Sequence, residues 1–209
     1  MLTTMLVEGI LSQGTFSRRQ RLLFLGALVL IYAFSVFPHL GGPFIYDDGE
    51  ARFSVAVREM AAKNDWLLPR FHGLPIQKPP LAFWFMRLST LAFGEKEYAF
   101  RLPSALFGLG GVLLTFYWGS QVFSPRTGLL AGLILTTSFQ YFWLSRKAQL
   151  DMPYAFFIVL ALVSGSLAIQ RGHPRLLLAT GASMALATMI KGLGGVLLPM
   201  AVIGLFVFK

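Results

Sequence analysis

The sequence contains no cysteine and few charged residues, and each shortage excludes a class of protein. Without cysteine the chain forms no disulfides and has no thiolate chemistry. Charged residues make up 13% of the chain, whereas a soluble domain carries roughly 25%. The three histidines, His39, His72 and His173, are far apart in sequence and lack ligand spacing, which argues against a histidine metal site. These shortages exclude an ordinary water-soluble fold.

Long apolar stretches take the place of the missing charges. Hydrophobic residues form 56% of the 209 positions, including 20 Phe. A membrane-spanning helix needs about 20 mostly apolar residues. We therefore predict an all-α, polytopic transmembrane bundle. The candidate spans are residues 22–40, 102–122, 127–144, 152–169, 175–190 and 192–208. Only Lys191 and Gly192 separate the last two, which are either two short spans or one broken element.

Basic residues predict the orientation. Arg18, Arg19 and Arg21 precede the first stretch, which places residues 1–21 in the cytoplasm. Alternation then places residues 41–101, residues 145–151 and Lys191 outside. Arg146 and Lys147 break the positive-inside pattern, which indicates either a function for them or a wrong topology.

The net charge of +9 would fit nucleic-acid binding in a soluble chain. Here the bases lie at the ends of apolar stretches and form no stripe. We therefore expect membrane lipids rather than nucleic acid as partners.

Residues 41–101 form a long, polar external loop that holds seven of the nine acidic residues. Apolar residues from Phe53 to Ala61 follow helical spacing, with charged residues on the other face, which predicts an amphipathic helix in the membrane interface. Residues 81–93 are apolar but too short to span the membrane, so we predict a second interfacial helix there. We expect the chemistry in this loop.

Three acids, Asp47, Asp48 and Glu50, follow the first apolar stretch closely. Carboxylates this close raise one another's pKa, which suits a general base or a metal site. Acids are also favoured at the start of a helix, and spacing alone does not separate the two interpretations.

Four further positions are candidates for charge chemistry. Lys78, followed by two prolines, could hold a phosphate or simply extend to the lipid headgroups. Asp151 begins a span and is either functional or a helix cap. Lys191 between two apolar stretches is a functional base or marks an external turn. Arg101, before Leu102, is interpreted as an interface marker.

In order, these motifs resemble those of the GT-C glycosyltransferases, specifically the aminoarabinose transferase and protein mannosyltransferase-like group of families 39 and 83. The resemblance covers roughly residues 20–200 and corresponds to the N-terminal part of the family. It rests on Glu50-Ala51-Arg52-Phe53, Asp65-Trp66, Lys78-Pro79-Pro80, Arg101-Leu102-Pro103, Leu150-Asp151-Met152-Pro153 and Lys191-Gly192.

The resemblance implies an enzyme that takes a sugar from a polyprenyl-phosphate carrier and transfers it to a lipid or protein acceptor. It implies a multi-pass protein of the bacterial inner membrane with a periplasmic active site. Asp48 would be the base, with Asp47 or Glu50 as alternatives, and Asp151 would be a second acid. The substrate-binding residues would be Lys78, Arg52, Arg146, Lys147 and Lys191, of which Arg146 and Lys147 are inferred from topology rather than from the family.

The chain departs from the family pattern at two positions, and both bear on the site. The family usually has Asp-Glu three and two residues before the arginine, where this chain has Gly49 and Glu50, so the identity of the base is open. Gln77 replaces an acid before Lys78. A divalent metal cofactor is therefore left open and its ligands unassigned.

A transporter and a non-catalytic scaffold are the two alternative functions, and a last prediction concerns the extent of the domain. A transporter of lipid-linked sugars would place ionisable groups near mid-membrane and show internal repeats. A non-catalytic scaffold would not need the ordered acids and bases. Since family members are much longer, we expect residues 22–209 to form a transmembrane domain truncated at its C-terminus.

Overall fold

The computed structural model describes residues 17–38, 40–42 and 48–207. Its elements are helical except for one short strand pair within residues 70–75. In chain order they are α2 (Arg18–Val36), α3 (Asp48–Ala62), β1 (Arg70–Phe71), β2 (Leu74–Pro75), α4 (Leu81–Phe93), α5 (Glu97–Val122), α6 (Pro125–Thr137), α7 (Phe139–Ser145), α8 (Asp151–Arg171), α9 (Arg175–Lys191) and α10 (Gly194–Val207).

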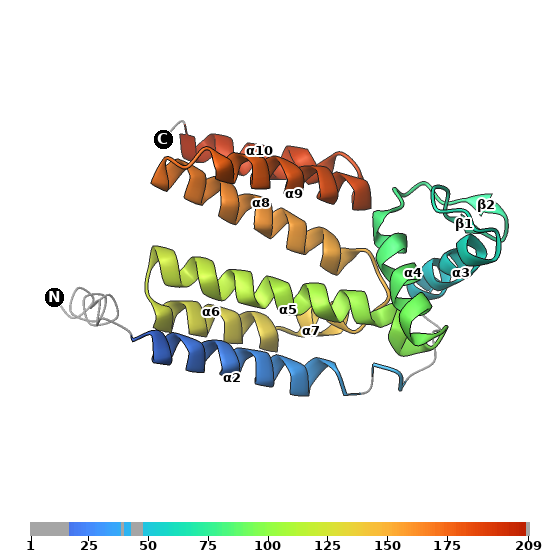
Figure 1. The fold of residues 1–209 in the computed structure, drawn as a ribbon, viewed down its shortest axis with the longest axis horizontal. Helices are drawn as coiled ribbons and strands as arrows, with labels where there is room; N and C mark the ends of the chain where they lie inside the picture. Colours follow the sequence, from blue (N-terminus) through green and yellow to red (C-terminus); the bar gives the residue numbers. More distant parts are fainter. Residues whose placement is uncertain (1–16, 39, 43–47, 208–209) are drawn as a thin grey trace.

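The apolar helices form a bundle, and the loop helices cover one of its ends. In Figure 1, α2, α5, α6, α8, α9 and α10 lie alongside one another, while α3, α4 and the strand pair project from one end. The most extensive contacts are between α8 and α9 and between α5 and α6. The predicted all-α bundle with two loop helices is confirmed. The described segments that were predicted to lie outside are found at this same end, which we call the outer end.

Three described helices are long and apolar enough to cross a membrane, namely α2, α5 and α8. Residues 127–144, predicted as a single span, do not form one continuous helix, because the helix breaks at Ser138. The backbone there is extended, with φ −68° and ψ 128°, and it separates α6 from α7. The Ser138 hydroxyl donates to the Leu135 carbonyl at 3.0 Å, which caps the free end of α6.

The question of one or two elements after residue 175 is resolved as two short helices. Gly192 has φ +87°, a conformation that glycine adopts without strain, and its amide donates to the Thr188 carbonyl at 2.8 Å. The chain then reverses, and α10 packs against both α9 and α8. The turn between α9 and α10 lies at the outer end of the bundle (Figure 1), and Lys191 is the last residue of α9.

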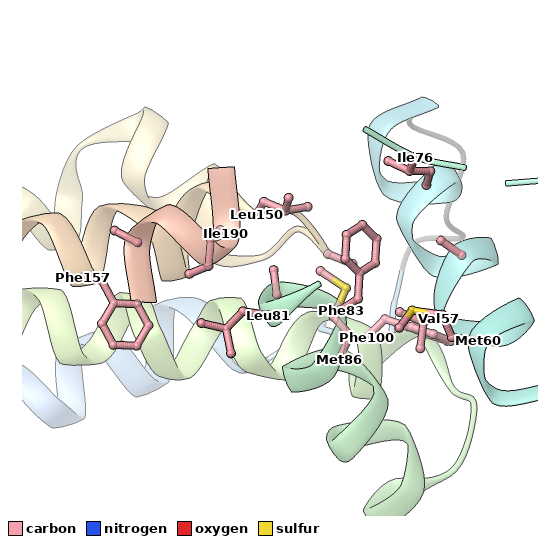
Figure 2. Packing of buried hydrophobic residues seen from close by; sticks show 14 of the residues in the cluster. Val57, Met60, Ile76, Leu81, Phe83, Met86, Phe100, Leu150, Phe157 and Ile190 are labelled. Carbon is pink, nitrogen blue, oxygen red and sulfur yellow. The ribbon is translucent and has the colours of Figure 1, made fainter. Parts of the chain in front are cut away.

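A hydrophobic cluster joins the loop helices to the bundle. Figure 2 shows Phe83 and Met86 of α4 and Phe100 of α5 meeting Val57 and Met60 of α3. The same cluster continues toward Leu81, Leu150, Phe157 and Ile190. Since all of these side chains are at least nine-tenths buried, α3 and α4 are part of the folded core.

Polar contacts fix the chain between α3 and α4. Both Glu59 carboxylate oxygens accept backbone N–H groups of the turn, from His72 at 2.7 Å and Gly73 at 3.1 Å. The buried Arg87 side chain donates to the Asp65 carbonyl at 3.1 Å, and its guanidinium lies 3.7 Å from the centre of the Trp66 ring. The loop is thereby held on the two helices that it connects.

Candidate active site at the outer end of the bundle

A buried carboxylate, Glu50, connects three segments at the outer end directly and a fourth through Arg101. It accepts from Arg101 Nε at 2.6 Å and Arg101 Nη2 at 3.0 Å, and from the Ala148 backbone N–H at 2.8 Å. Lys147 Nζ lies 3.5 Å from its second oxygen. Arg101 also donates through Nη1 to the Leu40 carbonyl at 2.7 Å. We call Glu50, Arg101, Lys147 and the Leu40 and Ala148 backbone groups the outer latch.

Burial makes the two charges of the latch costly unless they are fully paired. Glu50 is 0% and Arg101 1% exposed, so both charges have lost their water and need complete compensation. The fork of the guanidinium matches the two carboxylate oxygens, and the backbone groups satisfy much of the remaining capacity. Because both oxygens of Glu50 already accept hydrogen bonds, this carboxylate is poorly placed to take a proton from a substrate.

The two other acids of the first cluster lie just before the latch. Asp48 is the first residue of α3, two positions and about 3 Å of helix rise before Glu50. Its side chain is not among the described groups, and Asp47 lies outside the described residues altogether. The contacts of Glu50 therefore fix the start of α3, the turn of helix to which the backbone of Asp48 belongs.

Asp151 and Lys191, which the sequence offered as separate candidates, form an ion pair. Lys191 Nζ lies 2.6 Å from Asp151 Oδ1, and about a third of each side chain is exposed. Asp151 begins α8 and Lys191 ends α9, so each charge is also favoured by the dipole of its own helix. Leu150 occupies the N-cap position of α8, so Asp151 is not used as the cap.

The four remaining candidate cations differ in how firmly they are held. Lys78 and Arg52 are exposed, and the Arg52 guanidinium lies 6.0 Å from the centre of the Phe71 ring. Arg146 donates to the Pro38 carbonyl at 3.4 Å and lies 5.2 Å from the Phe142 ring centre. Lys147 Nζ lies 5.1 Å from the Trp143 ring centre and also contacts Glu50 of the latch. The two bases that break the positive-inside pattern are thus built into the outer end.

Sequence reasoning missed the main role of Arg101, which it interpreted as an interface marker. The available signal was an arginine just before the apolar stretch of α5, next to Pro103, where a charge without a partner would be costly. Among the described residues no group of three or more His, Asp or Glu side chains is arranged to hold a metal ion. No metal centre is assigned.

An apolar helical bundle with acids and bases gathered at one end is the architecture of a polytopic membrane protein. Residues 77–209 match the model of the dolichyl-phosphate-mannose-protein mannosyltransferase family, and the chain belongs to that family.

Curated relatives agree with this assignment. The undecaprenyl phosphate-alpha-4-amino-4-deoxy-L-arabinose arabinosyl transferase of Edwardsiella ictaluri is 31% identical over 149 residues, which cover 70% of this chain and 27% of that protein. The corresponding transferase 1 of Sodalis glossinidius is 30% identical over 188 residues, covering 85% of this chain and 33% of that protein.

Solved structures show the same likeness. ArnT from Cupriavidus metallidurans in the apo state superposes with a TM-score of 0.72 at 29% identity. The same protein bound to undecaprenyl phosphate gives 0.76 at 27% identity. Each comparison covers 90% of this chain and 35% of that one. The chain thus spans about a third of the length of the relatives that it matches.

Proposed function

We propose that this protein is a membrane glycosyltransferase that moves a sugar from a polyprenyl-phosphate carrier to a lipid or protein acceptor on the outer face of a bacterial inner membrane. The observation that carries the proposal is the gathering of Asp48, the Asp151–Lys191 pair and the bases Arg146 and Lys147 at one end of an apolar bundle. Relatives named for undecaprenyl phosphate-linked aminoarabinose transfer support it.

The physical chemistry of the carrier explains why the site belongs at the outer end. A polyprenyl tail stays in the hydrocarbon layer, so its phosphate cannot leave the headgroup region. The enzyme must therefore bring its catalytic groups to the interface. The helices α3 and α4 provide that platform, because the hydrophobic cluster fixes them to the end of the bundle.

The transfer step requires a base and a set of cations. The acceptor hydroxyl oxygen forms a bond to the anomeric carbon while its proton passes to the carboxylate of Asp48. The bond from that carbon to the phosphate oxygen breaks, and its electron pair stays on the carrier phosphate. Exposed Lys78 and Arg52 are free to approach this phosphate and stabilise its developing charge.

We assign Asp48 as the base on the family resemblance, and the two acids of the site whose side chains the structure describes are both engaged. Glu50 accepts from Arg101 and Ala148, and Asp151 is paired with Lys191. The donor proposed is an undecaprenyl phosphate-linked sugar, with an aminopentose as the first one to test. A transporter of the same lipids is less well supported, since the acids lie at the end of the bundle rather than at its middle.

The test is transfer of radiolabelled sugar from defined polyprenyl-phosphate donors in membranes. We expect Asp48→Ala to abolish transfer at normal expression, with a fall of at least about 10²-fold, since general base catalysis contributes 10²–10⁴-fold. Glu97→Gln is the matched control, because Glu97 is also an acid in the first turn of a helix at this end. It should leave transfer unchanged.

Two results would contradict the proposal in different ways. Equal transfer by Asp48→Ala and the wild type would place the base elsewhere, and Asp47 would be tested next. Absence of transfer by the wild type from every polyprenyl-phosphate donor would refute the glycosyltransferase assignment itself.

A further inference from the structure

We propose that Glu50 is a positioning residue for sugar transfer: it holds the start of α3, and with it Asp48, in fixed register with the loop that carries Arg146 and Lys147. This inference rests on the proposed function. Glu50 is thereby assigned neither as the base nor as a substrate ligand, although it lies in the acidic cluster where either role would be expected.

The first argument is that the Glu50 carboxylate connects the start of α3 with the connection between α7 and α8. Glu50 belongs to α3, and Ala148 and Lys147 belong to the connection between α7 and α8. The Ala148 N–H bond of 2.8 Å and the Lys147 contact of 3.5 Å both end on Glu50. The start of α3 and this connection are 98 residues apart in sequence, so no local structure keeps them in register.

The second argument is that the backbone groups of the latch determine which position can carry the cation and which the anion. Leu40 presents a carbonyl oxygen to Arg101, whereas Ala148 presents an N–H group to Glu50. A cation is therefore satisfied only at position 101 and an anion only at position 50. An exchange of the two charges would direct a carboxylate at a carbonyl and a guanidinium at an N–H group.

The third argument concerns what the loss of the latch would change. With both charges almost fully buried, removal of one leaves the other uncompensated. The chain relieves this by opening toward water, which separates the start of α3 from residues 146–148. Displacements of about 1 Å at reacting groups cost on the order of 10²-fold in rate.

Steady-state kinetics of Glu50→Gln in the full protein test the catalytic part of the inference. Glutamine keeps the side-chain volume and an acceptor for Ala148, but its amide NH2 opposes the Arg101 donors. We expect kcat to fall about 10²-fold while the KM for the donor changes less, because Lys78 lies outside α3 and the latch and remains in place. The pH–rate profile should keep an acidic limb, since Asp48 still supplies the base.

Two further variants separate positioning from general stability. Arg101→Lys keeps the charge but lacks the fork that serves Glu50 and Leu40 together, so it should reproduce the loss in kcat. The exchange Glu50→Arg with Arg101→Glu should fail to restore transfer, because the backbone groups fix the polarity. Recovery of wild-type kcat in the exchanged protein would overturn the inference, and so would loss of the acidic limb in Glu50→Gln.

A distance measurement tests the latch without any activity. Because the sequence has no cysteine, spin labels can be placed cleanly through Arg52→Cys on α3 and Gln149→Cys in the α7–α8 connection. We expect one narrow distance distribution with Glu50 present and a broad one in Glu50→Gln or, should that variant fail to assemble, in Arg101→Lys. An unchanged distribution refutes the positioning role, whereas a wild type without transfer activity refutes only the proposed function.

Discussion

The turn between α9 and α10 allows a sharp test of the packing, through the substitution Gly195→Ala. A Cβ atom at position 195 would meet the backbone nitrogen of Thr188 and would lie 2.6 Å from the carbonyl carbon of Ala187. These are backbone atoms of α9, which cannot rotate aside as a side chain can. The substitution must therefore push α10 away from α9 at the end that carries Lys191.

The expected cost follows from two opposing terms. Overpacking a tight site costs about 1–3 kcal/mol, while alanine is favoured over glycine within a helix by roughly 0.5–1 kcal/mol. Because the clash is with backbone, we expect a net destabilisation of about 1–2 kcal/mol. For a chain of this length that corresponds to a fall in Tm of about 2–8 °C.

The assay is thermal unfolding of the purified protein in detergent, with Gly181→Ala as the matched control. Gly181 also lies in the α9–α10 hairpin, but no heavy atom lies within 4 Å of the position that a Cβ atom would take there. This variant should unfold at the wild-type temperature or slightly above it. A Gly195→Ala protein as stable as Gly181→Ala would refute the close approach of α10 to α9.

Two further predictions concern charges at the outer end. In a double-mutant cycle of Asp151→Asn and Lys191→Met, followed by thermal unfolding, we expect a coupling of about 0.5–1 kcal/mol, since the pair is partly solvated; a coupling of zero would contradict the contact. Backbone N–H groups of Leu67 and Leu68 hold the pKa of Asp65 below its ordinary value of 3.8. Its stabilising effect is therefore fully present above that value and lost as pH falls through the lower, folded-state pKa. Asp65→Asn should flatten this acid dependence of Tm, and an unchanged pH profile would refute the capping role.

Several features of the fold were predictable because they depend on local composition. Residues 18–36, 97–122 and 151–171 are helical because apolar chain in a membrane must satisfy its backbone hydrogen bonds within itself. The loop helices were also readable, the first from its periodicity and the second from an apolar stretch too short to span the membrane. The break at Ser138 was not, because the surrounding stretch is uniformly apolar and hydropathy does not report backbone conformation.

The candidate site shows the same division between local and long-range information. The sequence indicated Glu50, Asp151 and Lys191 as charges that needed an explanation, but it could not pair them. Glu50 meets Arg101 across 51 residues, and Asp151 meets Lys191 across 40. Pairing at such separations is decided by how the helices pack.

By itself, the sequence determined that this is a helical membrane protein with most of its acidic residues in one loop, because the cost of placing charge and open backbone in hydrocarbon acts on each segment separately. Only the tertiary structure decided which acid is engaged. Burial at the junction of α3, α5 and the α7–α8 connection turns Glu50 into a structural link, and leaves Asp48 beside it in sequence for the proposed chemistry.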